Sequence, residues 1–242
     1  MKTIKRSNEL LWVLGVLFVA LGVAVCSKAN LGVSMIAAPA FVLHEALSPL
    51  WSGFSVGVLE YLVQGVLLIT MCLVTRRFDW RYLLAFAVAV VYGYVLDLFL
   101  WLLQDVTVHA IALRWLMLLT GDVCVAFGVA CCFRTYMPLQ VYELFVAELS
   151  ARFGWSIGKV KSGFDAGLLL LSLILAFSLF GDVTTFDWST ITHTSFHSIG
   201  LGTLVTTLIN SPLISLMGRL IDRCFEPTPL FPCWQVFLKR TD

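Results

Sequence analysis

The chain is poor in charged residues. Only 13% of its 242 residues are charged, whereas 60% are hydrophobic. A chain of this composition has too little polar surface to cover a water-soluble globule, so we expect lipid to be its solvent. No basic segment with interleaved aromatic residues indicates a nucleic-acid partner.

The sequence also lacks the short motifs of catalysis and metal binding. It contains no H-E-x-x-H, G-x-S-x-G or C-x-x-C pattern and no nucleotide-binding glycine loop. We therefore expect no enzymatic activity and no cofactor. The seven cysteines suit small apolar packing positions in helices. His193 and His197 are weak candidates for metal ligands, because no third ligand stands at a firm spacing from them.

Six long apolar segments dominate the sequence. The hydrocarbon core of a bilayer is about 30 Å thick, and a helix needs about 20 apolar residues to cross it. The segments cover roughly residues 9–27, 54–75, 80–103, 114–133, 163–181 and 198–218. They predict an all-α membrane protein with six transmembrane helices. The first helix is expected to be a permanent span and not a cleaved signal peptide.

Lysine and arginine are distributed unevenly around these segments. If the N-terminus is cytoplasmic, all of the 16 Lys and Arg residues except Lys28 and Arg114 fall on the cytoplasmic side. This is the positive-inside pattern for six spans with both termini in the cytoplasm. We therefore predict a multi-pass protein whose main partner is the lipid bilayer.

The first half of the sequence resembles the second half. The segments 20–26 and 126–132 are identical at five of seven positions, and Lys28 matches Arg134 at the same offset of 106 residues. Three spans per half would place the second copy upside down relative to the first, which is the usual architecture of a secondary transporter. We predict a single membrane domain over 1–242. It comprises two inverted 3+3 repeats, at about 9–103 and about 114–218, and a cytoplasmic tail at 219–242.

Each half contains a further short segment after its first span. These segments, 35–47 and 137–149, are too short to cross a bilayer upright and predict an extra interfacial or re-entrant helix in each half. A cation precedes each of them, and a cation beside a helix N-terminus with free N–H groups can bind an anion. Ser34 is the expected N-cap of the first short helix. The candidate residues at the two breaks are Lys28, Asn30, Ser34, Arg134 and Gln140.

The alternative at both breaks is that the two cations only mark the ends of spans.

Polar side chains inside the spans form the second set of candidates. Burying a charge at the bilayer centre costs about 2.5–3.5 kcal/mol on insertion scales, so each one needs a reason. They could form a substrate or coupling-ion site, or they could be paired structural groups. Asp165, close to Lys159 and Lys161, fits a helix N-terminal charge. The candidates within the spans are Glu60, Gln64, Asp97, Asp122 and Asn210.

Several short motifs carry a resemblance to a known family. They are Lys28-Ala-Asn-Leu-Gly-Val-Ser34, Gly93-x-x-x-Asp97, Gly200-Leu-Gly-Thr203 and Ser211-Pro212. In these motifs the chain resembles the YczE/YitT-type family of bacterial inner-membrane proteins over essentially its whole length. It departs from that pattern at Met35, where proline is common, and at Ser211, where glycine is common. The resemblance implies a small multi-pass protein of the bacterial inner (cell) membrane that is involved in transport or export.

Two functions remain open from the sequence. The first is secondary transport, with a proton as a candidate coupling ion, of a small organic substrate that is anionic or zwitterionic. The second is a non-transporting membrane partner or scaffold that assists the assembly or regulation of another complex. In that case the Gly-x-x-x-Gly pairs Gly53/Gly57 and Gly154/Gly158 could pack one subunit against another, for example in a homodimer.

Overall fold

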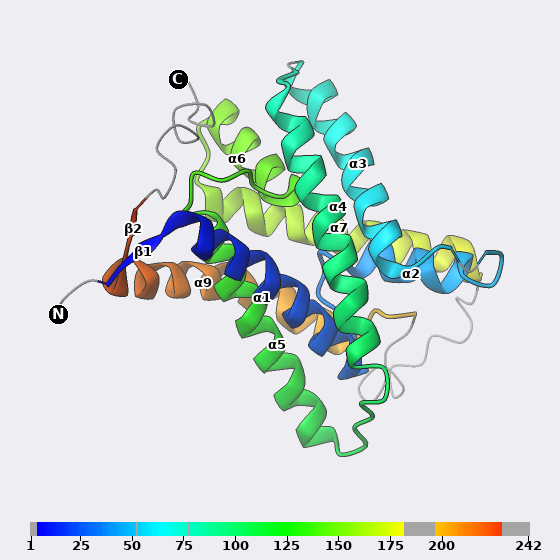
Figure 1. Ribbon diagram of the computed structural model, residues 1–242. Helices are drawn as coiled ribbons and strands as arrows, with labels where there is room; N and C mark the ends of the chain where they lie inside the picture. Colours follow the sequence, from blue (N-terminus) through cyan, green and yellow to red (C-terminus); the bar gives the residue numbers. More distant parts are fainter. Residues whose placement is uncertain (1–3, 52, 77, 182–196, 229–242) are drawn as a thin grey trace.

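The computed structural model describes residues 4–51, 53–76, 78–181 and 197–228 (Figure 1). This part of the chain is helical apart from two short strands at its ends. Six helices are long and apolar enough to cross a membrane, as the sequence predicts. They are α1 (Asn8–Lys28), α3 (Val56–Thr75), α4 (Arg81–Leu102), α5 (Ile111–Cys132), α7 (Ile157–Phe180) and α9 (Leu201–Cys224). The shorter elements are α2 (Ala38–Leu47), α6 (Val141–Phe153), β1 (Ile4–Ser7) and β2 (Phe225–Thr228).

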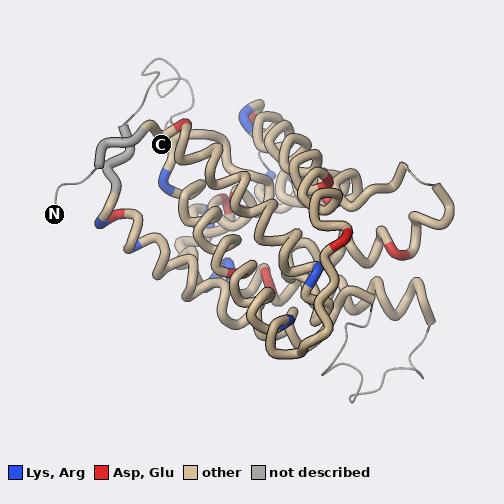
Figure 2. Tube along the Cα trace, turned by 60° about the horizontal axis from the view of Figure 1, so that its bottom comes forward, with Lys and Arg blue, Asp and Glu red and all other residues tan. Residues whose placement is uncertain are grey.

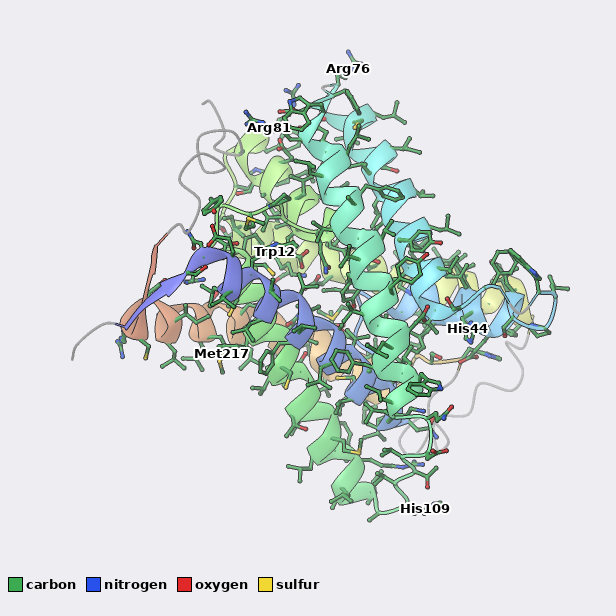
Figure 3. All side chains as sticks on the ribbon, viewed as in Figure 1. Trp12, His44, Arg76, Arg81, His109 and Met217 are labelled. Atoms are coloured by element: carbon green, nitrogen blue, oxygen red, sulfur yellow. The ribbon has the colours of Figure 1, made fainter. Side chains whose placement is uncertain are left out.

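Internal backbone hydrogen bonds explain why the apolar segments are helices. In lipid no water is available to the backbone, so a spanning segment must bond its own N–H and C=O groups. Charged residues are sparse along these helices (Figure 2). Figure 3 places Arg76 and Arg81 at one end of the bundle and His44 and His109 toward the other. We name the end with Arg76 and Arg81, where α1 begins and α9 ends, the terminal face. The other end is the opposite face.

The boundaries of two helices differ from the prediction. Helix α7 begins at Ile157, six residues before the predicted start, because Lys161 remains helical through its ion pair with Asp165 one turn later. The predicted role of Asp165 as a helix N-terminal charge is therefore wrong. Helix α9 continues through Pro212 to Cys224, so it includes the first residues of the predicted tail.

Helices α1 and α5 form the closest packed pair, and glycine makes this approach possible. A Cβ on Gly22 would lie 2.6 Å from the carbonyl oxygen of Gly121, and one on Gly121 would lie 2.8 Å from that of Gly22. Gly15 and Gly128 face each other in the same reciprocal way, at 2.9 and 2.5 Å. Because the earlier glycine of α1 meets the later glycine of α5, the two helices run antiparallel.

Helices α3 and α4 also meet through glycine. A Cβ on Gly57 would meet the carbonyl oxygen of Gly93, and one on Gly93 would lie 2.6 Å from that of Gly57. The second predicted pair does not pack in this way. Gly154 ends α6 with φ +67°, and added Cβ atoms on Gly154 and Gly158 would meet nothing closer than 4.0 Å.

The two predicted short helices exist, and each packs between α3 and α7. They begin later than expected, at Ala38 and Val141. The prediction that the Ser34 side chain caps α2 is wrong. The N-cap residue is Ala37, and no side chain accepts a capping hydrogen bond at this helix start. The Ser34 carbonyl instead accepts hydrogen bonds from the N–H groups of Ala37 and Ala38, each at 3.0 Å.

The two ends of the described chain meet at the terminal face. Strand β1 pairs in parallel with β2, and Ile4 lies opposite Phe225 in the register. The Ser7 side chain then caps α1 by accepting a hydrogen bond from the N–H of Leu10. The first and last helices are thereby tied together (Figure 1).

Candidate functional site

Two buried polar side chains project from the first half of α3. Glu60 and Gln64 stand one helical turn apart and are both fully buried. Neither carboxylate oxygen of Glu60 and neither amide atom of Gln64 forms a hydrogen bond of normal geometry within the described chain. Buried polar groups are almost always satisfied, so this pair requires an explanation.

A second buried polar group comes from α5 and α7. The Lys161 ammonium donates to Asp165 Oδ1 at 2.7 Å, and the side chains are 4% and 0% exposed. Asp122 of α5 is 1% exposed and interacts electrostatically with both residues. Asp122 Oδ1 and Asp165 Oδ2 have no hydrogen-bond partner among the described residues.

Helix α6 connects the two groups. The hydroxyl of buried Tyr142 is close enough to the Glu60 carboxylate to interact with it, although no bond of normal geometry forms. Burial raises the pKa of Tyr142 well above its ordinary value, and the Glu60 charge adds to this effect. Glu143 interacts electrostatically with Lys161 and Asp165. Burial also raises the pKa of Glu143, and the nearby Lys161 ammonium partly opposes that shift.

We call this assembly the buried polar cluster, and α4 completes it with Tyr92, which interacts with Glu60 and Glu143. Its members come from five helices on both sides of the chain midpoint. They are Glu60, Gln64, Tyr92, Asp122, Tyr142, Glu143, Lys161 and Asp165.

The charges of the buried polar cluster do not balance. It contains four carboxyl groups but only one ammonium group, that of Lys161. The carboxyl groups are not gathered on one point, because the described residues contain no group of three or more His, Cys, Asp or Glu side chains that could hold a metal ion. The arrangement is therefore extended, with Glu60 near one end, Asp122 near the other and Glu143 between them.

A cavity of about 410 Å³ leads from the terminal face toward the cluster. Its lining includes Arg134, Asp222 and Ser211 near the end of the bundle, and Lys161 of the cluster itself. The Arg134 guanidinium donates two hydrogen bonds to the Asp222 carboxylate, at 2.5 and 2.7 Å. This ion pair lies at the mouth of the cavity, where the Asp222 side chain is 57% exposed.

A second cavity, of about 350 Å³, lies at the opposite face. Lys28, Asn30 and Glu45 are among its lining residues. The Lys28 ammonium donates to the carbonyl oxygen of Gln104 at 3.3 Å. His197 Nδ1 lies 3.0 Å from Glu45 Oε2, so this predicted metal candidate is engaged in a hydrogen-bond contact. The other candidate, His193, lies outside the described residues.

The structure does not support an anion site at the start of α2. The N–H groups of Ala37 and Ala38 are already bonded to Ser34, and Pro39 has no N–H to offer. The first positions of α2 therefore do not offer Lys28 the full set of free helix donors that the sequence suggested. Arg134 is likewise committed to Asp222.

The other sequence candidates are divided between the cluster and its surroundings. Glu60, Gln64 and Asp122 belong to the cluster, whereas Asp97 lies nearer the opposite face. Asp97 accepts hydrogen bonds from the Ser55 hydroxyl at 2.6 Å and the Gly57 N–H at 2.8 Å, so it holds the start of α3. Buried Asn210 of α9 has two unpartnered amide atoms.

Gln140 is the N-cap residue of α6, and its buried Nε2 has no hydrogen-bond partner within the described chain. Ser34 is buried, and its hydroxyl contacts the sulfur of Met35.

Sequence reasoning missed Tyr92, Tyr142, Glu143, Lys161 and Asp165 as members of the site. Glu143 is buried on the side of α6 that faces the protein interior, and this becomes visible only in the fold. A signal for Lys161 was present in the sequence. Aligning Gly57 with Gly158, at an offset of 101, places Lys161 and Asp165 at the positions of Glu60 and Gln64.

The architecture defines a multi-pass helical membrane protein. A model of the family described as a family of unknown function, DUF6198, matches residues 4–219, and the chain belongs to this family. No curated protein and no solved structure matches the chain.

Proposed function

We propose that the protein is a secondary transporter of a small organic solute, with the proton as coupling ion, and that it is not an enzyme. The observation that carries the proposal is the buried polar cluster, which unites side chains from both halves of the chain and leaves several of their polar atoms unpartnered. Intramembrane ionisable residues mark substrate paths and proton relays as a rule.

The free energy needed to bury the polar cluster in the membrane argues that it binds a ligand. Each buried charge at the bilayer centre costs about 2.5–3.5 kcal/mol on insertion scales. A purely structural role would favour fully paired groups, because a half-satisfied polar network is worse than an apolar core. The alternative of a non-transporting membrane partner, including a homodimer held by glycine pairs, offers no use for these interior groups.

Reciprocal packing supports the inverted repeat within this proposal. If α1 is exchanged with α5, α2 with α6, α3 with α7 and α4 with α9, the main helix pairs are converted into one another. The α3–α4 pair becomes α7–α9, α1–α4 becomes α5–α9, and α2–α7 becomes α6–α3. The glycine contacts of α1 and α5 are reciprocal in the same sense. Transporters with inverted repeats place their binding site at the interface of the repeats.

We further propose that the terminal face is cytoplasmic and that the protein lies in the bacterial inner membrane. Arg76, Arg81, Arg134 and Arg219 all lie at or near the terminal face, in agreement with the positive-inside rule. The resemblance to YczE/YitT-type proteins is consistent with this location. The cavity lined by Arg134 and Lys161 would then form the cytoplasmic approach to the cluster.

A proton-flux assay tests the proposal. Purified protein in liposomes that enclose a pH-sensitive dye is exposed to alkylamines, amino acids and organic acids, one at a time. At least one solute should drive proton movement in the wild type. The variants Glu60→Gln and Asp122→Asn should lose it, whereas Asp105→Asn, which changes an exposed carboxylate outside the cluster, should retain it. Equal proton movement in Glu60→Gln and wild-type vesicles would refute a role for the cluster.

A further inference from the structure

We propose that the buried polar cluster binds a small organic cation, such as an alkylammonium or guanidinium group, and not the anionic or zwitterionic substrate that the sequence suggested. This inference rests on the proposed function, since it names the substrate class of the same site. The first observation that supports it is the excess of carboxyl groups over the single ammonium of Lys161.

The unpartnered atoms point to the same class of ligand, because an ionised carboxylate can only accept hydrogen bonds. Most of them are acceptors, namely both oxygens of Glu60 and one oxygen each of Asp122, Glu143 and Asp165. An ammonium ion brings three donors and no acceptor, and a guanidinium brings five donors. A ligand of this kind beside Glu60 would satisfy the two oxygens of that carboxylate, whereas an anion would add further acceptors.

The aromatic residues of the site also suit a cation. Tyr92 and Tyr142 are buried beside Glu60, and the Lys161 ammonium lies 6.0 Å from the centroid of the Phe164 ring. Aromatic faces attract ammonium and guanidinium groups. The resident Lys161 thus shows how an ammonium is accommodated among carboxylates and aromatic rings, and we infer that the ligand occupies the Glu60 side of the cluster in a similar way.

The two cations that suggested an anion are placed elsewhere. Lys28 lies at the opposite face and bonds to the Gln104 carbonyl, and Arg134 is held by Asp222. Neither forms part of the cluster. The side chains that would meet a solute in the interior are therefore mainly carboxylic.

Thermal unfolding of the purified protein tests this substrate class directly. The probes are methylammonium, ethylammonium and guanidinium chloride, compared with sodium chloride, sodium acetate and sodium lactate at equal ionic strength. At ten times its Kd, at least one organic cation should raise Tm by about 3–6 °C, and the sodium salts should not. Glu143→Gln should reduce this shift, whereas Glu148→Gln, a matched change five residues later in α6, should preserve it.

A second measurement uses the wild type and so does not depend on the folding of variants. A hydrophobic carbodiimide should label Glu60 or Glu143, and the stabilising cation should slow that labelling severalfold, as read by mass spectrometry. Stabilisation by acetate or lactate alone, an equal shift with sodium chloride, or no effect of any organic cation in either assay would overturn the inference. Proton flux driven only by anions would refute the inference but leave the proposed transport intact. Binding of a cation without any flux would support the inference and refute transport.

Discussion

The Lys161–Asp165 pair allows the charge imbalance of the cluster to be measured. Replacing Lys161 by methionine removes the one ammonium of the cluster and leaves its four carboxyl groups without a cation. Breaking a buried pair by removing one partner costs about 3–5 kcal/mol, because the remaining charge is uncompensated. We expect Lys161→Met to lower the free energy of unfolding by about that amount.

Removing the carboxylate of the pair should lower the free energy of unfolding by less than removing the ammonium. Asp165→Asn leaves the Lys161 ammonium with Glu143 and Asp122, both of which interact with it. We therefore expect a loss of only about 1–2 kcal/mol, in the range for a hydrogen bond to a charged group. The difference between the two variants follows from three carboxyl groups, those of Asp122, Glu143 and Asp165, that interact with one ammonium.

Unfolding in mixed micelles of mild detergent and dodecyl sulfate, followed by tryptophan fluorescence, would measure both variants. Lys159→Met is the matched control, because Lys159 is exposed two residues away and its loss should stay within about 0.5 kcal/mol. If Lys161→Met cost no more than this control, or if Asp165→Asn were the more damaging variant, the assigned charge balance would be refuted.

Three further predictions concern the frame around the cluster. Gly121→Ala should lower Tm and weaken the α1–α5 contact at a cost of about 1–3 kcal/mol, while Gly163→Ala, with nothing within 4 Å, should leave Tm unchanged or raise it. Asp97→Ala should cost about 1–3 kcal/mol in unfolding experiments, because two bonds at the start of α3 are lost; an unchanged Tm would contradict this. Asp222→Asn should speed modification of a cysteine placed at Ser215 in the terminal-face cavity by at most about fivefold, since the half-exposed Arg134–Asp222 ion pair contributes about 0.2–1 kcal/mol. A slower reaction would contradict the placement of this ion pair at the mouth of the cavity.

The sequence predicted the overall architecture well, because apolar length and charge distribution follow directly from the chemistry of the bilayer. All six spans and both short helices exist within the described residues. The start of α7 was misplaced because the predicted apolar segment begins only after Lys161, and hydropathy alone does not reveal that Asp165 pairs with Lys161 one turn later.

The candidate site could be predicted only in part. Glu60, Gln64 and Asp122 stand out in sequence as polar residues within spans. Tyr142 and Glu143 do not, because the short helix that carries them is polar on one side, and only its packing between α3 and α7 shows that this side faces inward. Lys28 and Asp97 looked equally functional, but their bonding partners are far apart in sequence and become visible only in the fold.

Solvent access to Gln64 tests the central claim of a solute site most directly. In a variant without native cysteines, Gln64→Cys would be exposed to a charged, membrane-impermeant thiol reagent from each side of oriented vesicles. Leu62→Cys is the control, because Leu62 is 47% exposed on the outer surface of α3, where lipid would cover it. Alternating access predicts reaction of Gln64→Cys from both sides, slowed by the bound cation, and none at Leu62→Cys. Reaction of Gln64→Cys from neither side would contradict the account.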